Sequence, residues 1–223
     1  MERHVNMNEI SDGKKYKSND MVKLGCNECE GCSDCCRQVG NSIVLDPWDI
    51  FMLQKNLSQN FEEMLGEILE LHVVDGVVLP NLKLRQNGEG CVFLNEEGRC
   101  GIHAFRPGFC RLFPLGRLYE NQSFVYFLQT GECKKERRTK VKISKWLGIA
   151  PLAAYEKFIC QWHYLLKGIQ QAAKGMEEQE LRKWSLYFLQ EFFVRPYDTE
   201  DFYIQFESRY QKAKELSCNM QGK

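Results

Sequence analysis

The sequence predicts an α+β protein in which an irregular, cysteine-ligated metal-binding region with short hairpins precedes a C-terminal helical part. Nine of its 11 cysteines lie between Cys26 and Cys133. Turn-bounded strand patterns occur in the same half, whereas apolar residues beyond Pro151 recur every three or four positions, as in helices. We therefore expect a flexible tail over 1–20, a cysteine-cluster metal-binding domain over 21–140, and a helical region over 141–223 packed on it.

The first elements follow from composition and capping signals. Residues 1–20 are polar and lack periodicity, which predicts a mobile tail. Residues 42–45 are a strand candidate, and Asp46 followed by Pro47 is typical of a helix N-terminus. Ser58 is then expected to cap a second helix whose apolar residues continue to Leu69.

Two hairpins are predicted in the middle of the chain. The period changes over 73–84, where Asp75-Gly76 is a typical two-residue hairpin turn. Residues 115–128 form a second candidate, with Glu120-Asn121 as the turn and aromatic residues in the arms. The segment 91–133 also contains irregular turns, including 95–98, so we expect an external tie to hold it.

The segment 134–145 is strongly basic, with seven basic residues against one acidic residue. Such a run is typical of a solvated connector. The alternative is an interaction surface whose binding would depend on salt.

The last third predicts three helices with large aromatic residues at helical spacing. They span about 152–169, 177–194 and 199–217, with Gly175 as a stop signal after the first. The aromatic residues are expected to form a packing face between these helices.

Composition limits the partners and the compartment. Thirty basic residues balance 30 acidic ones, so no net charge favours nucleic acid, and we do not expect nucleic acid as a partner. No apolar run approaches the ~20 residues of a membrane span. The N-terminus has no secretion signal pattern, so we expect a cytoplasmic protein. No protein partner is indicated.

Metal binding explains the cysteines better than disulfides do, because cytoplasmic thiols are kept reduced. Each Cys-x-x-Cys turn can direct two sulfurs to one point, and thiolates from elsewhere complete a tetrahedral site. Cys35 and Cys36 are adjacent, and in extended backbone they would point to opposite faces. This predicts two neighbouring metals or one polynuclear cluster.

The spacing leaves the metal open between zinc and iron. Cys26, Cys29, Cys32 and Cys36 reproduce an iron-sulfur spacing of bacterial ferredoxins, although Arg37 replaces the usual proline. Zinc fits a loop-rich fold equally well. Thiolate ligands argue against magnesium and calcium, because these ions prefer oxygen ligands. Nine cysteines exceed the eight that two four-thiolate sites need, and Cys26 is the expected spare.

These cysteines lie in motifs that resemble a known family. The motifs are 29–37 (CxxCxxCCR), 91–94 (CVFL), 98–103 (GRCGIH) and 106–114 (RPGFCRLFP). Together they resemble the YkgJ cysteine-cluster family, also known as the CxxCxxCC zinc- or iron-chelating domain. The resemblance implies a metal-binding protein and places the ligand candidates on Cys29, Cys32, Cys35, Cys36, Cys91, Cys100, Cys110 and Cys133, with Cys26 as a ninth candidate.

The resemblance implies no particular reaction, and no catalytic residue is indicated. Flagellin lysine N-methylases contain a similar cysteine cluster. The alternative function is therefore an iron-sulfur enzyme, either a redox protein or a protein lysine methylase-like one, although the chain lacks a Gly-rich turn for a nucleotide methyl donor. Arg37, Arg106 and Arg111 adjoin cysteines and are expected to offset thiolate charge.

Overall fold

The structure is a computed structural model that describes residues 6–25, 32–37, 43–85, 90–135, 138–198 and 200–221. It has the predicted α+β fold, in which each sheet is a two-stranded antiparallel pair. By contacts the chain divides into two compact units, each assembled from two segments. We call Val44–Lys83 with Ala153–Lys223 the helical unit, and Glu2–Ile43 with Leu84–Leu152 the cysteine unit. The domain boundaries expected from the sequence stay a prediction.

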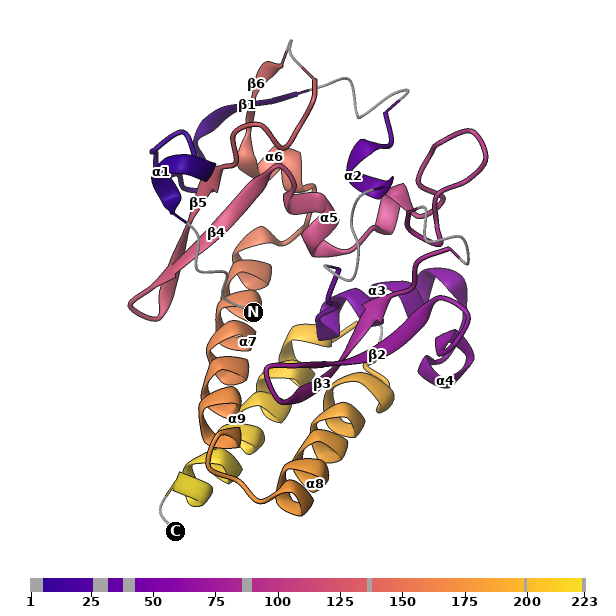
Figure 1. Cartoon of the computed structure of the whole chain (residues 1–223), viewed down its shortest axis with the longest axis vertical. Coiled ribbons are helices and arrows are strands. Elements are labelled where there is room, and N and C mark those ends of the chain that lie inside the picture. Colours follow the sequence, from indigo (N-terminus) through magenta and orange to yellow (C-terminus); the bar gives the residue numbers. More distant parts are fainter. Residues whose placement is uncertain are drawn as a thin grey trace. The chain divides into compact units, whose positions relative to one another are not determined.

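The helical unit combines one hairpin with the long C-terminal helices (Figure 1). Its elements are α3 (Pro47–Leu57), α4 (Phe61–Met64), β2 (Leu69–Val74), β3 (Val77–Leu82), α7 (Leu152–Ala173), α8 (Glu178–Leu189), the π-helix η4 (Gln190–Val194) and α9 (Phe202–Gln221). The three helices expected from the sequence are confirmed, and β3 packs against α8.

Capping residues set the start of α3 as predicted. Asp46 Oδ1 accepts a hydrogen bond from Asp49 N at 2.9 Å, and Asp49 Oδ2 accepts one from Asp46 N at 3.2 Å. This reciprocal capping box satisfies backbone N–H groups that a helix N-terminus leaves unpaired.

The expectation that Ser58 begins a second helix is wrong. Ser58 ends α3 in the left-handed conformation, with φ of 55°, and Asn60 caps the short helix α4 instead. Leu69, predicted to be helical, pairs with Leu82 in the β2–β3 hairpin. Gly66, with φ of 88°, lies between α4 and β2 and ends the helical run.

The turn of the first hairpin is confirmed. Asp75 and Gly76 have φ of 50° and 85°, the left-handed pair that a type I′ turn requires. Val74 and Val77 pair on either side of it. The strong local turn signal therefore fixes the register of β2 against β3.

The aromatic packing face predicted for the C-terminal helices is confirmed. Phe158 and Phe206 meet edge to face with ring centroids 4.6 Å apart, and Trp162 stacks on Phe188 at 5.1 Å. All four side chains are buried. Such pairs contribute about 0.5–1.5 kcal/mol each beyond the burial of their area.

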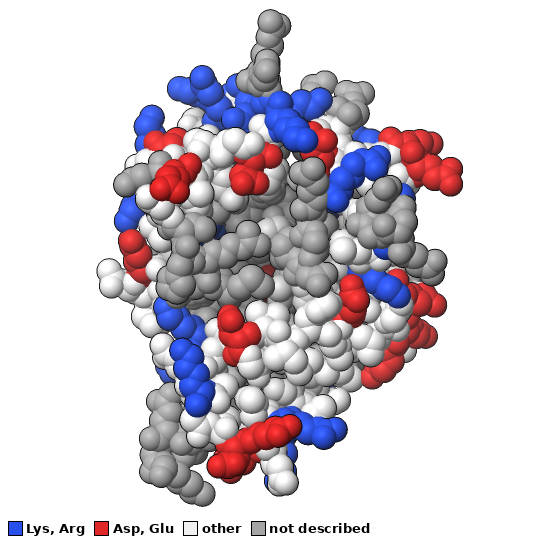
Figure 2. All heavy atoms as spheres, in the orientation of Figure 1, with Lys and Arg blue, Asp and Glu red and all other residues white. Residues whose placement is uncertain are grey.

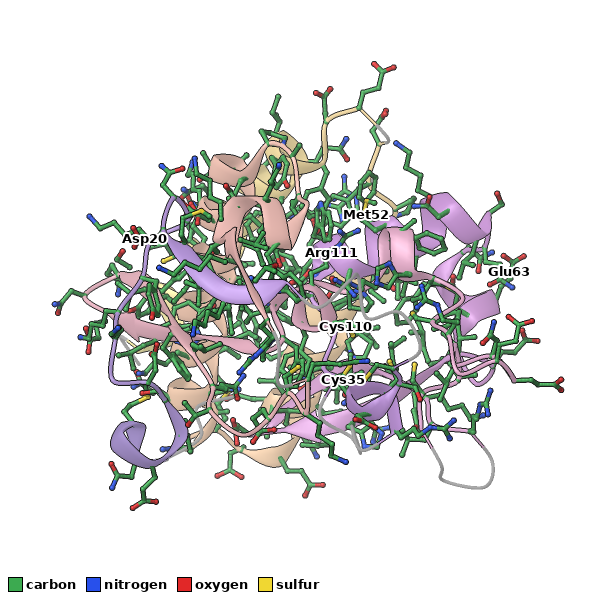
Figure 3. The ribbon with its side chains drawn as sticks, turned by 90° about the horizontal axis from the view of Figure 1, so that it is seen from above. Asp20, Cys35, Met52, Glu63, Cys110 and Arg111 are labelled. Atoms are coloured by element: carbon green, nitrogen blue, oxygen red, sulfur yellow. The ribbon has the colours of Figure 1, made fainter. Side chains whose placement is uncertain are left out.

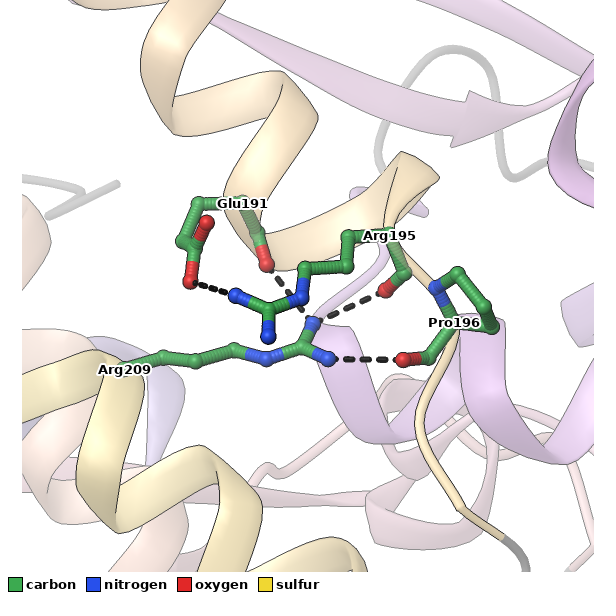
Figure 4. Close-up of polar contacts among 4 residues, drawn as sticks. All are labelled: Glu191, Arg195, Pro196 and Arg209. Carbon is green, nitrogen blue, oxygen red and sulfur yellow. Dashed lines mark hydrogen bonds and ion pairs between the residues drawn. The ribbon is translucent and has the colours of Figure 1, made fainter.

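A buried arginine closes the end of η4 (Figure 4). Arg209 donates hydrogen bonds to the carbonyl oxygens of Glu191, Arg195 and Pro196 at 2.6–2.8 Å. Its guanidinium also lies 3.8 Å from the ring centroid of Tyr197. These bonds satisfy carbonyls that the end of a helix leaves without an intrahelical donor.

The cysteine unit has shorter elements and more irregular backbone. They are α1 (Met7–Ile10), β1 (Met21–Gly25), α2 (Asp34–Arg37), the 3₁₀-helix η3 (His103–Phe105), α5 (Gly108–Leu112), β4 (Leu115–Glu120), β5 (Ser123–Leu128), β6 (Thr139–Lys142) and α6 (Ile143–Leu147). Residues 6–20, expected to belong to a tail, contain α1, and Tyr16 forms a bridge with Tyr126 of β5.

Two pairings in this unit differ from the sequence expectations. The turn of β4–β5 is Asn121-Gln122, with φ of 51° and 57°, one residue later than predicted. The basic segment is not only a connector, because β6 pairs with the distant strand β1 and α6 follows directly. Leu24 of β1 and Ile143 of α6 are fully buried in the core beneath that pair.

Within the described ranges, no helix is both long enough and apolar enough to span a bilayer.

Candidate metal centre

The predicted ligands that the structure describes all belong to the cysteine unit. Cys26 and Cys29 lie outside the described residues. The other seven are free thiols: Cys32, Cys35, Cys36, Cys91, Cys100, Cys110 and Cys133. Cys160, which was not predicted to be a ligand, is in the helical unit.

Helix α2 presents Cys35 and Cys36 differently from the sequence expectation. Ser33 O accepts hydrogen bonds from the N–H groups of Cys36 and Arg37 at 2.8 and 3.1 Å, so the adjacent cysteines lie in a helical turn. The Cys36 side chain has the largest influence on the pKa of the Cys35 thiol, which it raises. The opposite-face argument is therefore wrong here, because it assumed extended backbone, and both thiols can serve one centre.

A backbone hydrogen bond joins α2 to the second group of cysteines. Cys91 N donates to Cys36 O at 2.9 Å, although 55 positions separate the residues. The preceding Gly90 has φ of 98°, and a Cβ there would lie 2.8 Å from Cys36 O. Only glycine allows this approach without strain. Gly90 was not singled out from the sequence. Its position directly before Cys91 was the signal that could have identified it.

A tight loop brings Cys91 and Cys100 near each other. Leu94 N donates to Cys91 O at 3.0 Å, and Leu94 forms a bridge with Cys100. The predicted turn is present, since Gly98 N donates to Asn95 O at 3.1 Å. The loop therefore returns the chain to a point where the two cysteines interact electrostatically.

Three of the described ligand candidates have a raised pKa. Burial raises the pKa of Cys91 and of Cys100 above the ordinary thiol value. The hydrogen bond with Cys36, followed by burial, raises the pKa of Cys35. Cys35, Cys91 and Cys100 therefore favour the neutral form unless a cation is bound, and a metal ion stabilises the thiolate form.

Arg106 supplies positive charge at this point. It lowers the pKa of both Cys35 and Cys100, opposing the effect of burial. Its Nη1 lies 2.7 Å from His103 Nε2, so that ring nitrogen is engaged. Its Nε is buried with no hydrogen-bond partner among the described residues. This orphaned donor fits an anionic thiolate–metal centre beside it, because four thiolates on a divalent ion leave net negative charge.

The other two arginines have different contacts. Arg111 is buried and donates to the carbonyl oxygens of Arg106 and Leu147 at 3.0 and 3.2 Å, which ties η3 and α5 to the end of α6. Arg37 Nε donates to Ser33 Oγ at 2.9 Å. Of the three arginines, Arg106 thus has the interaction with cysteines that was expected.

A small cavity of about 30 Å³ adjoins the first cysteines. It is lined by three predicted ligands, Cys32, Cys35 and Cys133, and by Asp34, Phe113, Pro114, Glu132, Lys134, Lys135 and Trp146. The Cys32 thiol lies 3.8 Å from Asp34 Oδ2. Sequence reasoning missed Asp34, Glu132 and Trp146 because their sequence neighbours do not predict this long-range convergence.

Cys110 is carried by α5 (Figure 3). Phe113 and Pro114, which follow that helix, line the cavity that Cys32 and Cys133 share. Across the ranges described, no three His, Cys, Asp or Glu side chains are arranged closely enough to hold a metal ion. The described cysteines thus approach one another in smaller groups within one unit.

Free thiols concentrated on the loops of an α+β unit, beside the buried and unpaired Nε of Arg106, are typical of the thiolate metal-binding class of proteins. Comparison with protein families matches residues 28–143 to CxxCxxCC, described as "Putative zinc- or iron-chelating domain". This match covers just over half of the chain, and the chain belongs to that family. Neither curated proteins nor solved structures gave a match.

Proposed function

We propose that this chain binds zinc or iron through thiolates of its cysteine unit. The proposed ligands are Cys29, Cys32, Cys35, Cys36, Cys91, Cys100, Cys110 and Cys133, with Cys26 as a ninth candidate. The observation that carries the proposal is the hydrogen bond from Cys91 N to Cys36 O, which joins two cysteine motifs that are distant in sequence. Soft thiolate ligands are those that zinc and iron accept.

Two groups of thiols support two neighbouring metal positions. One group, Cys91 and Cys100, interacts electrostatically, and Cys100 also interacts with Cys35. The other, Cys32 and Cys133, lines the small cavity together with Cys35. Cys35 belongs to both groups, so a cluster that shares this residue and two adjacent single-metal sites both fit the proposal.

Nearby positive charge supports an anionic centre. Lys134 and Lys135 line the cavity beside Cys133, together with Asp34 and Glu132, and Arg106 interacts with Cys35. Cations beside thiolates offset the negative charge that four thiolates leave on a divalent metal. The arrangement therefore favours retention of the metal.

The proposed role of the metal is to stabilise the loops. Between Gly90 and Phe109 the buried apolar side chains are Cys91, Leu94, Ile102 and Pro107. So few buried groups contribute little hydrophobic stabilisation to a long irregular segment. A structural metal supplies such stabilisation through its thiolate bonds.

Metal analysis of protein purified without oxygen tests the proposal. About two zinc ions per chain and a colourless solution would indicate paired four-thiolate sites. Iron with acid-labile sulfide and broad visible absorption would indicate an iron-sulfur cluster. Cys36→Ser and Cys91→Ser should each lower the metal content.

Cys160→Ser is the matched control, because it removes a half-buried thiol from the helical unit and should leave the metal content unchanged. Full metal content in both Cys36→Ser and Cys91→Ser would contradict the proposed ligand set.

A further inference from the structure

Strands β1 and β6 form a two-stranded ribbon with one apolar face and one basic face. Val22 and Leu24 of β1 are buried in the core of the cysteine unit. Lys23 of the same strand and Lys140 and Lys142 of β6 are exposed. We call these three lysines the basic ribbon face.

The register places these charges side by side. Lys23 lies directly opposite Lys140, and Met21 lies opposite Lys142. Because side chains alternate along a strand, Lys140 and Lys142 project from the same side of β6. Their Cα atoms are about 6.6–6.8 Å apart, from the rise of a strand.

Among the described residues, no ion pair compensates the charge of the basic ribbon face. Neither strand contains an acidic residue. Figure 2 shows Lys and Arg side chains gathered over β1 and β6. Like charges directly opposite each other in a ribbon are destabilising. The fold thus bears an electrostatic cost here, although the whole chain is neutral.

Protection of a free strand edge would account for one or two lysines. Mixed charges would also protect an edge and would avoid the repulsion between Lys23 and Lys140. Three charges of one sign on a single face instead match an anionic partner.

Phosphate is the anionic group that suits this surface. Protein–protein interfaces are enriched in aromatic residues and arginine and depleted in lysine. The basic ribbon face has three lysines, the neighbouring Met21 and no aromatic side chain on either strand. Lysine contacts with nucleic acid go largely to phosphates and carry no sequence information. The distance between Lys140 and Lys142 along β6 is about twice the 3.4 Å axial rise per phosphate of a single nucleic-acid strand.

We propose that the basic ribbon face binds the phosphate backbone of a nucleic acid without sequence preference. The sequence expectation against nucleic acid relied on net charge, which averages the two units and conceals this local face. The proposal is independent of metal identity, because none of the three lysines is a proposed ligand.

Binding of a short fluorescein-labelled oligothymidine to the metal-loaded full chain, followed by fluorescence anisotropy across a salt series, tests this proposal. Three phosphate contacts predict a slope of about −2 for the logarithm of the association constant against the logarithm of salt concentration. The triple variant Lys23→Gln, Lys140→Gln, Lys142→Gln should remove most of that slope and weaken binding at low salt at least about tenfold.

Two further triple variants make the test specific. Replacement of the exposed Lys174, Lys183 and Lys212 by Gln removes the same charge from the helical unit and should leave binding unchanged. Replacement of the ribbon lysines by Arg keeps the charge and should retain binding. Metal content and circular dichroism establish that each variant is folded.

Three outcomes would overturn the proposal. The first is no binding of oligothymidine at low salt. The second is equal weakening by the two Gln triples, which would mean that only net charge matters. The third is binding of labelled polyglutamate as tight as that of oligothymidine, which would indicate an acidic protein partner instead.

Discussion

The helical unit and the cysteine-bearing loops of the cysteine unit are stabilised in different ways. In the helical unit, Phe158 packs against Phe206 and Trp162 against Phe188, all in the buried core. In the cysteine unit, the segment around Gly90 is positioned by backbone hydrogen bonds and by thiols that approach one another. Side-chain burial is an intrinsic source of stability, whereas a thiolate cluster is stable only while its metal and its reduced state persist.

The first prediction separates the units by removing the metal. A zinc or iron chelator under reducing conditions should increase amide hydrogen exchange at Cys36, Cys91 and their neighbours, while α7 keeps its protection. Structural zinc sites contribute about 10–16 kcal/mol in small domains, so this effect should be the largest. Mass spectrometry of exchanged peptides measures it. Equal loss of protection in α7 would mean that the helical unit also depends on the metal.

The second prediction reverses the comparison. Phe158→Ala should lower the free energy of unfolding of the helical unit by about 3–5 kcal/mol, because the removed ring is fully buried between other aromatic rings. Metal content should not change. Denaturant unfolding followed by circular dichroism measures the loss.

Leu186→Ala is the control for Phe158→Ala, since Leu186 is 59% exposed and its truncation should change stability by less than about 0.5 kcal/mol. A metal content that falls with Phe158→Ala would show that the units are not energetically separate.

The third prediction tests the close approach at Gly90. Gly90→Ala should strain a backbone with φ of 98° and force Cys91 away from Cys36 O, at a cost of about 1–3 kcal/mol. The metal content and the thermal midpoint of the metal-bound protein should both fall. Gly168→Ala is the matched control, because no atom lies within 4 Å of an added Cβ in α7. It should be neutral or stabilising by up to about 1 kcal/mol.

The fourth and smallest prediction concerns acid stability of the helical unit. Hydrogen bonds from Lys157 and then Gln161 lower the pKa of Glu207 from 4.5 to about 2, against the effect of burial. A lowered pKa in the folded state adds stability above pH 4.5, which is lost as the pH falls to about 2. The carboxylate side chain is 33% exposed, so we expect at most about 1 kcal/mol.

Glu207→Gln should therefore be less stable than the natural protein at pH 7, and this difference should shrink at pH 3. Denaturant midpoints at the two pH values measure it. A difference that grows as the pH falls would contradict the lowered pKa.

Local signals account for the elements that the sequence predicted. Asp46 before Pro47, the Asp75-Gly76 turn and the aromatic periodicity of α7 each determine structure within a few residues. The prediction for Ser58 was wrong because serine is common at helix starts. Here Ser58 adopts the left-handed conformation at the end of α3. Asn121-Gln122 carries no glycine, so the turn of β4–β5 was placed one residue early.

These local signals do not predict which distant strands pair with each other. Neither Lys23 nor Lys140 indicates that β1 and β6 meet, because 117 positions separate them. The candidate site behaves similarly: spacing identified its cysteines, and the family match supports metal binding, but the ligand set stays a prediction. Arg106 was expected to lie beside a thiolate because Cys110 is close to it in the sequence. In the structure its electrostatic interactions include Cys35 and Cys100.

The interleaving of the two units has a consequence for synthesis on the ribosome. Val44–Lys83 leaves the ribosome before its partners in Ala153–Lys223 exist, and Leu84–Leu152 must be made in between. At about 5–20 residues per second this takes several seconds. During that interval apolar residues such as Leu53 and Phe61, buried in the finished protein, lack their later neighbours. The cysteine unit, in contrast, is complete once Leu152 emerges, so it can capture its metal before the helical unit closes.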